Sequence, residues 1–510
     1  MPVKIAFLHT TSGYLLTRGP MLHKTENDFH KMEYLLVNTM KNAPQNYLSA
    51  VLGPAHDAAV AARDPVAYMA ALDEHRIRKL TPQLAYCFSN EYYARKMREA
   101  GVSDPREITT LDQFRALPAF MTKSWHRESQ AESLEKFGHS FGMHLCAPLE
   151  DVVHVAGTSG TTGLPTFYLF TRKDLDLTFL TLGRLMTMAG IRRGDTILQL
   201  FGLSIWVAGT TMLQAAEALG ARPIPLGAEA GVTKALQYIQ LCRPRVLFCT
   251  PSMLSQLIER APEQLGKPLN LCGIEIVMCG GEPGLAIPAV RKRMQDGSGA
   301  KVYDMSGGAW TNAAGDCGGP DHVGQHCFGE DYCFRYDLVD PETRAPLPLV
   351  DGQVGEAIHT GMEYEAAPAL RYASADILKL HVGECPHCGR FGSRFSFVGR
   401  ADDMMNISGV KVYPSAIKEV VESFSPDISG QMRIVLDRAP PRVIPPVNIT
   451  VEAAAHVGEA NWADFAKKLE DRIHLQLKIR SKVKMVAAGS LETSNLKTKL
   501  VQVLDSAEKT

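Results

Sequence analysis

The middle of the chain alternates short apolar runs with amphipathic helical stretches, and this alternation limits the fold more than any other sequence feature. Five apolar runs each end in Gly, Ser or Pro: DTILQLFGL, ARPIPLG, RVLFCTPS, IEIVMCGG and AKVYDMSGG. The stretches between them are typical of helices: LQAAEALG, KALQYIQLC, SMLSQLIERA and AIPAVRKRMQD. This order predicts an α/β fold, with a large multi-layer N-terminal domain built on parallel sheets. Ligands of such sheets bind beyond the carboxyl ends of the strands, where the glycine-rich pieces fall.

The pattern changes after about residue 402. SGVKVYPSAIKEVVESF predicts a turn, a strand and a helix, MRIVLDRAP and VNITVEAAA predict strands, and WADFAKKLEDRIHLQLKI predicts an amphipathic helix. We therefore expect three parts: an N-terminal extension of unassigned role over residues 1–65, a main domain over 66–401, and a small α+β domain over 402–510.

Composition excludes several classes of protein. Lys plus Arg total 54 and Asp plus Glu total 55, so the net charge of −1 offers no basic footprint for nucleic acid or anionic membrane. The 11 cysteines are an odd number in a long chain, which argues against a disulfide scaffold. No apolar stretch approaches the roughly 20 residues of a membrane-spanning helix. We expect a cytoplasmic protein with no nucleic-acid or membrane partner.

A glycine- and hydroxyl-rich segment, AGTSGTTGLPT, occupies residues 156–166. Glycines permit close backbone approach, and successive N–H and hydroxyl groups surround phosphate oxygens well. The segment is not a Walker loop, because the GK[ST] ending is absent. The alternative is an ordinary surface loop, since glycine and serine are common in turns.

A second local signal is the pair Cys385 and Cys388 in ECPHCGR, whose spacing lets two thiolates chelate one ion. Further donors lie upstream in DCGGPDHVGQHCFGED, which contains Cys317, His322, His326 and Cys327. The alternative is a set of reduced, unliganded thiols.

The glycine segment resembles the signature loop of the adenylate-forming enzymes, the acyl-CoA synthetase and ligase superfamily. It is most similar to the phenylacetate–CoA ligase branch, in which the loop ends in Pro-Thr. Four further segments match the family in order: GGEPG (280–284), YDMSGG (303–308), RYASAD (371–376) and VGRADDMMNISGVKVYPSAIKEV (398–420). The resemblance covers roughly residues 67–510.

The resemblance implies a two-step ligase. ATP and Mg²⁺ activate an aromatic or small carboxylic acid to an acyl-adenylate with release of pyrophosphate, and CoA then accepts the acyl group as a thioester. Transfer to an amine or a carrier-protein thiol is an alternative. Another is a nucleotide-binding homologue with weakened catalysis, because Gly307 stands where many members have a Mg²⁺-holding glutamate. A homodimer is the usual assembly of the branch.

The resemblance also implies the nucleotide site, in which Asp376 binds the ribose hydroxyls and Arg400 the ribose or phosphate. Lys497 and Thr161 are the implied catalytic residues, and Lys499 is the alternative to Lys497 because Leu496 replaces the usual glycine. The full ATP- and AMP-binding set is Thr158, Ser159, Gly160, Thr161, Thr162, Gly163, Gly281, Glu282, Pro283, Tyr303, Asp304, Met305, Ser306, Asp376, Arg400 and Lys497. Glu282 or Asp304 would then help to hold Mg²⁺.

Three further sets follow from the resemblance. Asp402 is the hinge about which a mobile C-terminal lid domain rotates, and Ser408, Gly409, Val410 and Lys411 line the CoA channel. The acyl pocket is formed by Phe201, Trp206, Gly280, Gly307 and Trp310. The branch also selects Cys317 and His326 to join Cys385 and Cys388 in a closed Cys3His zinc site, which would be structural; His322 and Cys327 are the alternative donors.

Overall fold

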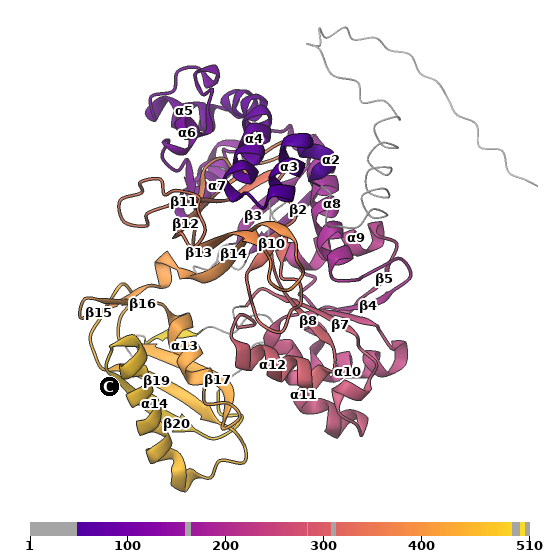
Figure 1. Cartoon of the computed structure of the whole chain (residues 1–510), viewed down its shortest axis with the longest axis vertical. Coiled ribbons are helices and arrows are strands. Elements are labelled where there is room, and N and C mark those ends of the chain that lie inside the picture. The colour runs from indigo at the N-terminus through magenta and orange to yellow at the C-terminus, as the bar shows by residue number, and fades with distance from the viewer. Residues whose placement is uncertain (1–47, 159–164, 283, 308–312, 492–499, 505–510) are drawn as a thin grey trace, which may run out of the picture.

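The computed structural model describes residues 48–158, 165–282, 284–307, 313–491 and 500–504 (Figure 1). Across these ranges, no helix has both the length and the apolar character needed to span a bilayer. Residues 3–8, whose short apolar run favours a strand, lie outside the described residues.

The N-terminal part of the described chain is helical. Its helices are α2 (Ser49–Leu52), α3 (Pro54–Ala62), α4 (Pro65–Phe88), α5 (Glu91–Glu99), α6 (Leu111–Arg115) and α7 (Lys123–Phe137). The sequence has a helical pattern from residue 67 to 98, but the first helix of this region ends at Phe88. The Asn90 side chain accepts hydrogen bonds from the backbone N–H groups of Tyr92 (3.0 Å) and Tyr93 (3.4 Å), so it caps a new helix instead of continuing the old one.

One half of the main sheet is parallel and runs in the order β8-β7-β6-β4-β5. Its strands are β4 (Thr196–Gln199), β5 (Arg222–Pro225), β6 (Val246–Cys249), β7 (Ile276–Gly280) and β8 (Lys301–Ser306). The connecting helices are α9 (Val207–Ala218), α10 (Gly231–Cys242), α11 (Pro251–Leu265) and α12 (Pro288–Ser298). All five predicted strands and all four predicted helices are confirmed, because buried apolar residues of the strands pack directly under the apolar faces of the helices.

The other half of the same sheet is antiparallel, an arrangement the sequence pattern did not predict. Beyond β8 the order continues through β9 (Ala314–Gly315), β10 (Gln325–Cys327), β14 (Phe391–Arg400), β13 (Tyr372–Glu384), β12 (Val354–Gly361) and β11 (Cys333–Val339). The short strand β1 (Met121–Thr122) pairs with β13, which completes a 12-stranded sheet. The predicted α/β class is thus confirmed, with parallel pairing throughout the β4–β8 half and, in the other half, only between β1 and β13.

The glycine-rich segment joins two strands of a separate hairpin. These strands are β2 (His154–Thr158) and β3 (Thr166–Phe170), paired antiparallel with Thr158 opposite Thr166. Helix α8 (Arg172–Met188) follows directly and begins with a capping box formed by Thr171 and Asp174.

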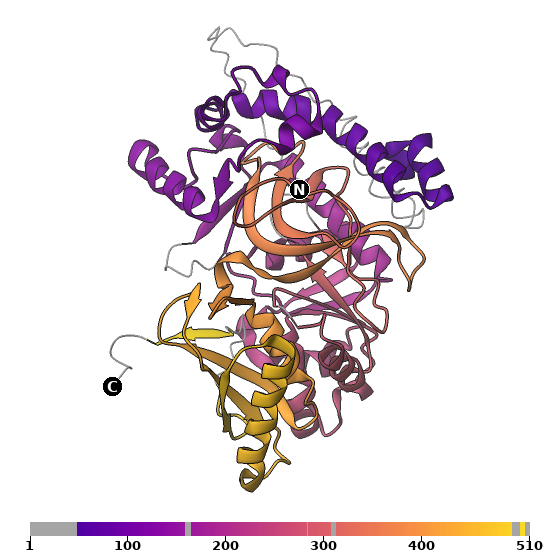
Figure 2. The same ribbon diagram turned by 60° about the vertical axis from the view of Figure 1, so that its left-hand side comes forward.

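The C-terminal unit, residues 405–504, has its own hydrophobic core, and the predicted small α+β architecture is confirmed. Its elements are β15 (Met405–Ile407), β16 (Val410–Val412), α13 (Pro414–Glu422), β17 (Ile428–Leu436), β18 (Arg442–Val443), β19 (Val447–Ala453), α14 (Trp462–Leu477), β20 (Ser481–Val486) and β21 (Val501–Val503). Figures 1 and 2 show this unit in gold beside the α10–α12 end of the body, with α13 turned toward α12.

The loop from β4 to α9 predicts one stability effect. A Cβ on Gly209 would lie 1.8 Å from the carbonyl oxygen of Gly202, so Gly209→Ala forces the loop off α9. We expect a fall of several degrees in the thermal midpoint, since backbone clashes cannot be relieved by rotating a side chain. Gly458→Ala is the control, because no atom lies within 4 Å of its Cβ position. Equal midpoints for both variants in differential scanning calorimetry would contradict the close packing described here.

Candidate functional site

The carboxyl ends of β7 and β8 lie side by side, with Gly280 opposite Met305. A Cβ at Gly280 would lie 2.8 Å from the Met305 carbonyl oxygen, and Gly281 has φ 84°, so both positions favour glycine. Glu282 follows this turn and accepts hydrogen bonds from the N–H (3.1 Å) and hydroxyl (2.9 Å) of Ser252. Its carboxylate therefore stabilises the N-terminus of α11.

Polar side chains of β8 are held by a residue that the sequence did not single out. The Gln325 amide on β10 donates to the Asp304 carboxylate at 2.8 Å, and its carbonyl accepts a hydrogen bond from the Ser306 hydroxyl. His322 Nε2 lies 3.2 Å from Asp304 Oδ2. The cross-strand neighbour could have been found only from the register of β8, β9 and β10, which the sequence pattern does not give.

Asp376, near the start of β13, is the cross-strand partner of Arg400, the last residue of β14. Arg400 donates to Asp376 at 2.9 Å and makes two hydrogen bonds of 2.8 Å to Asp402. Burial disfavours the charge of Arg400, but the Asp402 hydrogen bonds and the charge of Asp376 outweigh it and raise the pKa of the guanidinium. The sequence-predicted ribose residues and the predicted hinge residue are therefore in direct contact.

A cavity of about 380 Å³ opens beside this ion-pair group. Arg400 and Asp402 line one side, and Lys123 and Trp125 at the start of α7 line another. Burial raises the pKa of Tyr168 on β3, and the charge of Asp376 adds to the rise, so the Asp376 carboxylate also lies near the β2–β3 hairpin. The hairpin, the β13–β14 end and the first turn of α7 thus converge on one region.

The acyl-pocket segment is attached to the same hairpin. The N–H of Gly157 donates to the Ile205 carbonyl at 2.6 Å, and Gly157 forms a parallel bridge with Trp206. Phe201 is buried at the end of β4, and Gly280 lies at the end of β7, two strands away in the same sheet. Gly307 is exposed at the end of β8.

The predicted CoA-channel residues form the tight turn between β15 and β16. Ser408 and Gly409 have φ of 52° and 92°, and the Gly409 N–H donates to the Asn406 side chain at 2.9 Å. Lys411 forms an ion pair with Glu342 of the body. Nine predicted residues lie outside the described ranges: Ser159, Gly160, Thr161, Thr162, Gly163, Pro283, Trp310, Lys497 and Lys499.

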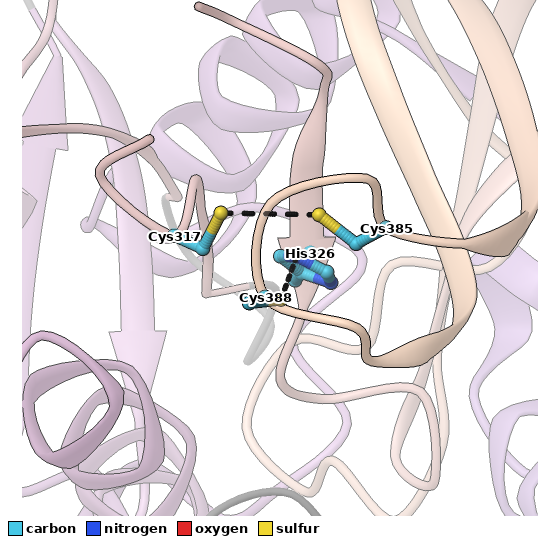
Figure 3. A group of neighbouring side chains, drawn as sticks. All are labelled: Cys317, His326, Cys385 and Cys388. Carbon is cyan, nitrogen blue, oxygen red and sulfur yellow. Dashed lines mark hydrogen bonds between the residues drawn. The ribbon is translucent and has the colours of Figure 1, made fainter. Parts of the chain in front are cut away.

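The four predicted metal ligands form one cluster (Figure 3). Their donor atoms all lie within 4.8 Å of one another, with 3.8 Å between the sulfurs of Cys317 and Cys385 and 3.5 Å between Cys388 Sγ and His326 Nε2. Zn–S bonds of about 2.3 Å and Zn–N bonds of about 2.0 Å place two sulfurs about 3.8 Å apart, and a sulfur and a nitrogen about 3.5 Å apart, on a tetrahedron. The donor set and its spacing therefore fit one zinc ion.

Strand alternation decides between the competing donors. His326 and Cys327 are consecutive in β10, so their side chains point to opposite faces of the sheet. His326 reaches the cluster, whereas Cys327 is buried in the apolar core formed with Tyr68 and Leu380. His322 contacts Asp304, as described above, and is not a member of the cluster.

Electrostatics within the cluster favour a thiolate at Cys388. A hydrogen bond from Cys317 and a further one from His326 lower the pKa of the Cys388 thiol to about 3. A deprotonated sulfur is the form that binds metal ions.

Comparison with known proteins gives consistent matches. The family model of AMP-binding enzymes matches residues 70–362, and that of the AMP-binding enzyme C-terminal domain matches residues 409–506. A phenylacetate-coenzyme A ligase of Thermus thermophilus is 31% identical over 81% of this chain and 89% of its own length. A phenylacetate-coenzyme A ligase of Pseudomonas putida is 29% identical over 86% of this chain and 96% of its own.

Crystal structures of 2-hydroxyisobutyryl-CoA ligase are also similar. The postadenylation state in complex with R3-HIB-AMP gives a TM-score of 0.76 at 28% identity, and the match covers 87% of this chain and 90% of that one. The thioesterification state, with 2-HIB-AMP and CoA, gives 0.58 at 29% identity, with 84% and 89% covered.

Helix α7, which supplies one wall of the cavity, buries a histidine pair behind it. The rings of His126 and His144 lie 4.4 Å apart, and the Ser129 hydroxyl is 2.8 Å from His144 Nδ1. Burial lowers the pKa of His126 to about 4 and that of His144 also well below its ordinary value. Both rings are therefore neutral in the folded protein at pH 7.

This pair predicts acid sensitivity. Between pH about 6.5 and 4 the unfolded chain protonates His126 but the folded protein does not, so stability falls as the pH falls. The His126 contribution lost between pH 7.5 and 5 is about 2 kcal/mol. His126→Phe should therefore show a smaller drop in thermal midpoint over this range than the wild type, while His456→Gln, at an exposed ring, should not. An unchanged pH dependence in His126→Phe would contradict the neutral buried pair.

Proposed function

The chain belongs to the AMP-binding enzyme family, and on that premise we infer that it is an AMP-forming CoA ligase. It uses ATP to convert a carboxylic acid into an acyl-adenylate and pyrophosphate, and then transfers the acyl group to CoA as a thioester. The observation that carries this conclusion is its similarity, over more than four fifths of the chain, to ligases of this type. The contact between Asp376 and Arg400 beside a cavity of about 380 Å³ supports a nucleotide site at that place.

The first step brings two anions together, because the substrate carboxylate attacks the α-phosphate of ATP. Cationic groups fixed in advance around the phosphate stabilise the charge that develops in the transition state. We assign the ribose hydroxyls to Asp376 and the ribose or phosphate to Arg400. Lys497 supplies the second cation, and the hydroxyls and N–H groups of the 158–163 segment bind the phosphates.

Mg²⁺ would supply further positive charge on the phosphates. Among the described carboxylates near the site, Glu282 is bound to Ser252, and Asp304 is bound to Gln325. Because these carboxylates already have partners and Gly307 offers none, we propose that phosphate oxygens and water provide most of the Mg²⁺ ligands.

In the second step, the thiol of CoA attacks the activated acyl carbon, and AMP leaves. We propose that the C-terminal unit rotates about Asp402 between the two steps. Rotation would break the Lys411–Glu342 ion pair, since these residues belong to different units. It would free the Ser408–Lys411 turn to border the CoA channel.

The substrate is a carboxylic acid, which we propose to be aromatic or small. Phe201 and Trp206 supply apolar surface next to the hairpin of the glycine segment. Phenylacetate and 2-hydroxyisobutyrate, the acids in the names of the similar ligases, are the first candidates.

Residues Cys317, His326, Cys385 and Cys388 would hold a structural zinc ion. Four protein donors complete a tetrahedron and leave no open position for water or substrate. The ion would join three separate pieces of the sheet: the segment after β9, strand β10, and the turn between β13 and β14.

The function is tested by ATP–pyrophosphate exchange with a panel of aromatic and aliphatic acids, followed by thioester detection with CoA. Exchange with at least one acid, and CoA thioester formation from it, is the expected result. If product formed only with an amine or a carrier-protein thiol, that compound would be the acceptor in place of CoA. ATP binding without exchange for any acid would favour a non-catalytic homologue.

Two lysines of the 493–501 segment give a paired prediction. Lys497→Ala should reduce adenylation at least 100-fold, since removal of a preorganised charge partner commonly costs this much. Thioester formation from supplied acyl-adenylate should change far less, because that step does not need the phosphate cation. Lys499→Ala is the control, and a loss confined to Lys499→Ala would reassign the role.

Metal content gives a second prediction. Inductively coupled plasma mass spectrometry of the purified protein should find about one zinc ion per chain. The Cys385→Ser variant should contain much less zinc. Loss of the ion should lower the thermal midpoint by several degrees, because metal binding free energy adds to folding free energy. Cys242→Ser, an exposed thiol outside the cluster, is the control. A zinc-free wild-type protein of full stability would refute the site.

A further inference from the structure

An ion pair connects the C-terminal unit to the body at a distance from the hinge. Arg293 on α12 donates to Glu422 on α13 at 3.1 Å. The Glu422 side chain is only 2% exposed, and that of Arg293 is 30% exposed. Removal of one partner from such a contact is costly, because it leaves the other charge poorly solvated and unpaired.

The backbone around this pair leaves room for it. Gly430 on β17 has φ 88°, and a Cβ there would lie 2.7 Å from Arg293 Nη2 and 3.0 Å from Glu422 Oε1. A side chain at this position would therefore displace the ion pair. The C-terminal unit thus supplies both the carboxylate and the gap into which the Arg293 guanidinium fits.

A lysine on the same face of α13 faces the segment after β7. Lys418 lies one turn before Glu422, and its Nζ is 3.9 Å from the position that a Cβ of Gly284 would occupy. The carboxylates of Glu422 and Glu282 and the guanidinium groups of Arg293 and Arg433 are close enough to act on the charge of Lys418. These side chains border a small cavity of about 50 Å³ between the two units. Lys418 thereby places a positive charge beside the turn that carries Glu282.

Both contacts join α13 to the body, so a rotation of the C-terminal unit relative to the body would break them. The whole chain matches 2-hydroxyisobutyryl-CoA ligase better in its postadenylation state, with a TM-score of 0.76, than in its thioesterification state, with 0.58. An interaction that is present in one arrangement and absent in another shifts the population toward the first.

We propose that Arg293, Glu422 and Lys418 are positioning residues for the adenylation step. The Arg293–Glu422 pair stabilises this arrangement of the two units, and Lys418 stabilises Glu282 in its contact with the start of α11. This inference rests on the proposed two-step function. None of the three side chains takes part in the chemistry; they act through the placement of the C-terminal unit and of the nucleotide-binding turn.

The test uses Glu422→Gln, Arg293→Gln and the exchanged pair Arg293→Glu with Glu422→Arg in the full chain. Each single variant should slow ATP–pyrophosphate exchange about tenfold, and thioester formation from supplied acyl-adenylate and CoA should stay equal or rise. The exchanged pair should recover most of the lost adenylation rate. Lys418→Gln should raise the KM for ATP more than it lowers kcat. Lys468→Gln is the control, because its 2.6 Å ion pair with Asp464 lies within α14.

Equal losses in both half-reactions, or an exchanged pair as slow as the single variants while normally folded, would overturn the proposal. A separate arm does not depend on activity. Hydrogen–deuterium exchange of peptides from α12 and α13 should be faster in the single variants and return toward wild type in the exchanged pair. If the wild type exchanged no pyrophosphate with any acid, the proposed function would fail. The deuterium measurement would still decide whether the pair holds the two units together.

Discussion

The hydrogen bonds of the Arg400 guanidinium to Asp376 and Asp402 determine most of the arrangement of this protein. Arg400 is the last residue of β14 and binds Asp376, its partner across the sheet on β13, and Asp402, two residues further along the chain. Charge-assisted hydrogen bonds of 2.8–2.9 Å in a half-buried setting are strong and directional. One side chain therefore fixes the Asp376 carboxylate, the end of β14 and the direction in which the chain leaves for the C-terminal unit.

The two halves of the sheet contribute different residues to the candidate site. The parallel half presents the turn after β7 and the polar end of β8, while the antiparallel half carries Asp376 and Arg400. Gln325 on β10 links the halves by its contacts with Asp304 and Ser306. The adjacent residue, His326, belongs to the cysteine cluster. A metal ion there would stabilise the junction of the two halves, which lies close to the proposed nucleotide site. The ion would take no part in the reaction.

The sequence predicted some of these features well and could not predict others. Strands β4 to β8 were accessible because each is a short apolar run that ends in a turn residue. The antiparallel half was not, since residues such as Ser374, Asp376 and Lys379 interrupt the apolar pattern of β13. The cysteine pair could be recognised as a candidate metal site from its spacing. The choice of His326 over Cys327 followed from the family resemblance, and its physical reason, the alternation of side chains along β10, appears only in the structure.

Long-range polar contacts lie beyond sequence reasoning for a different reason. Glu282 accepts a hydrogen bond from Ser252 at the N-terminus of α11, 30 residues earlier in the chain, and no sequence pattern indicates that contact. Arg293 and Glu422 are 129 residues apart, and each alone has the appearance of an ordinary surface charge. Only the packing of two separately folded units makes them a buried pair.

An AMP-forming ligase splits ATP between its α- and β-phosphates to activate an acid for CoA. Phosphorus NMR of a reaction with ATP, Mg²⁺, CoA and the best acid of the panel measures this directly. We expect AMP and pyrophosphate in equal amounts, matched by the amount of acyl-CoA thioester. Formation of ADP or free phosphate together with the thioester would contradict this expectation.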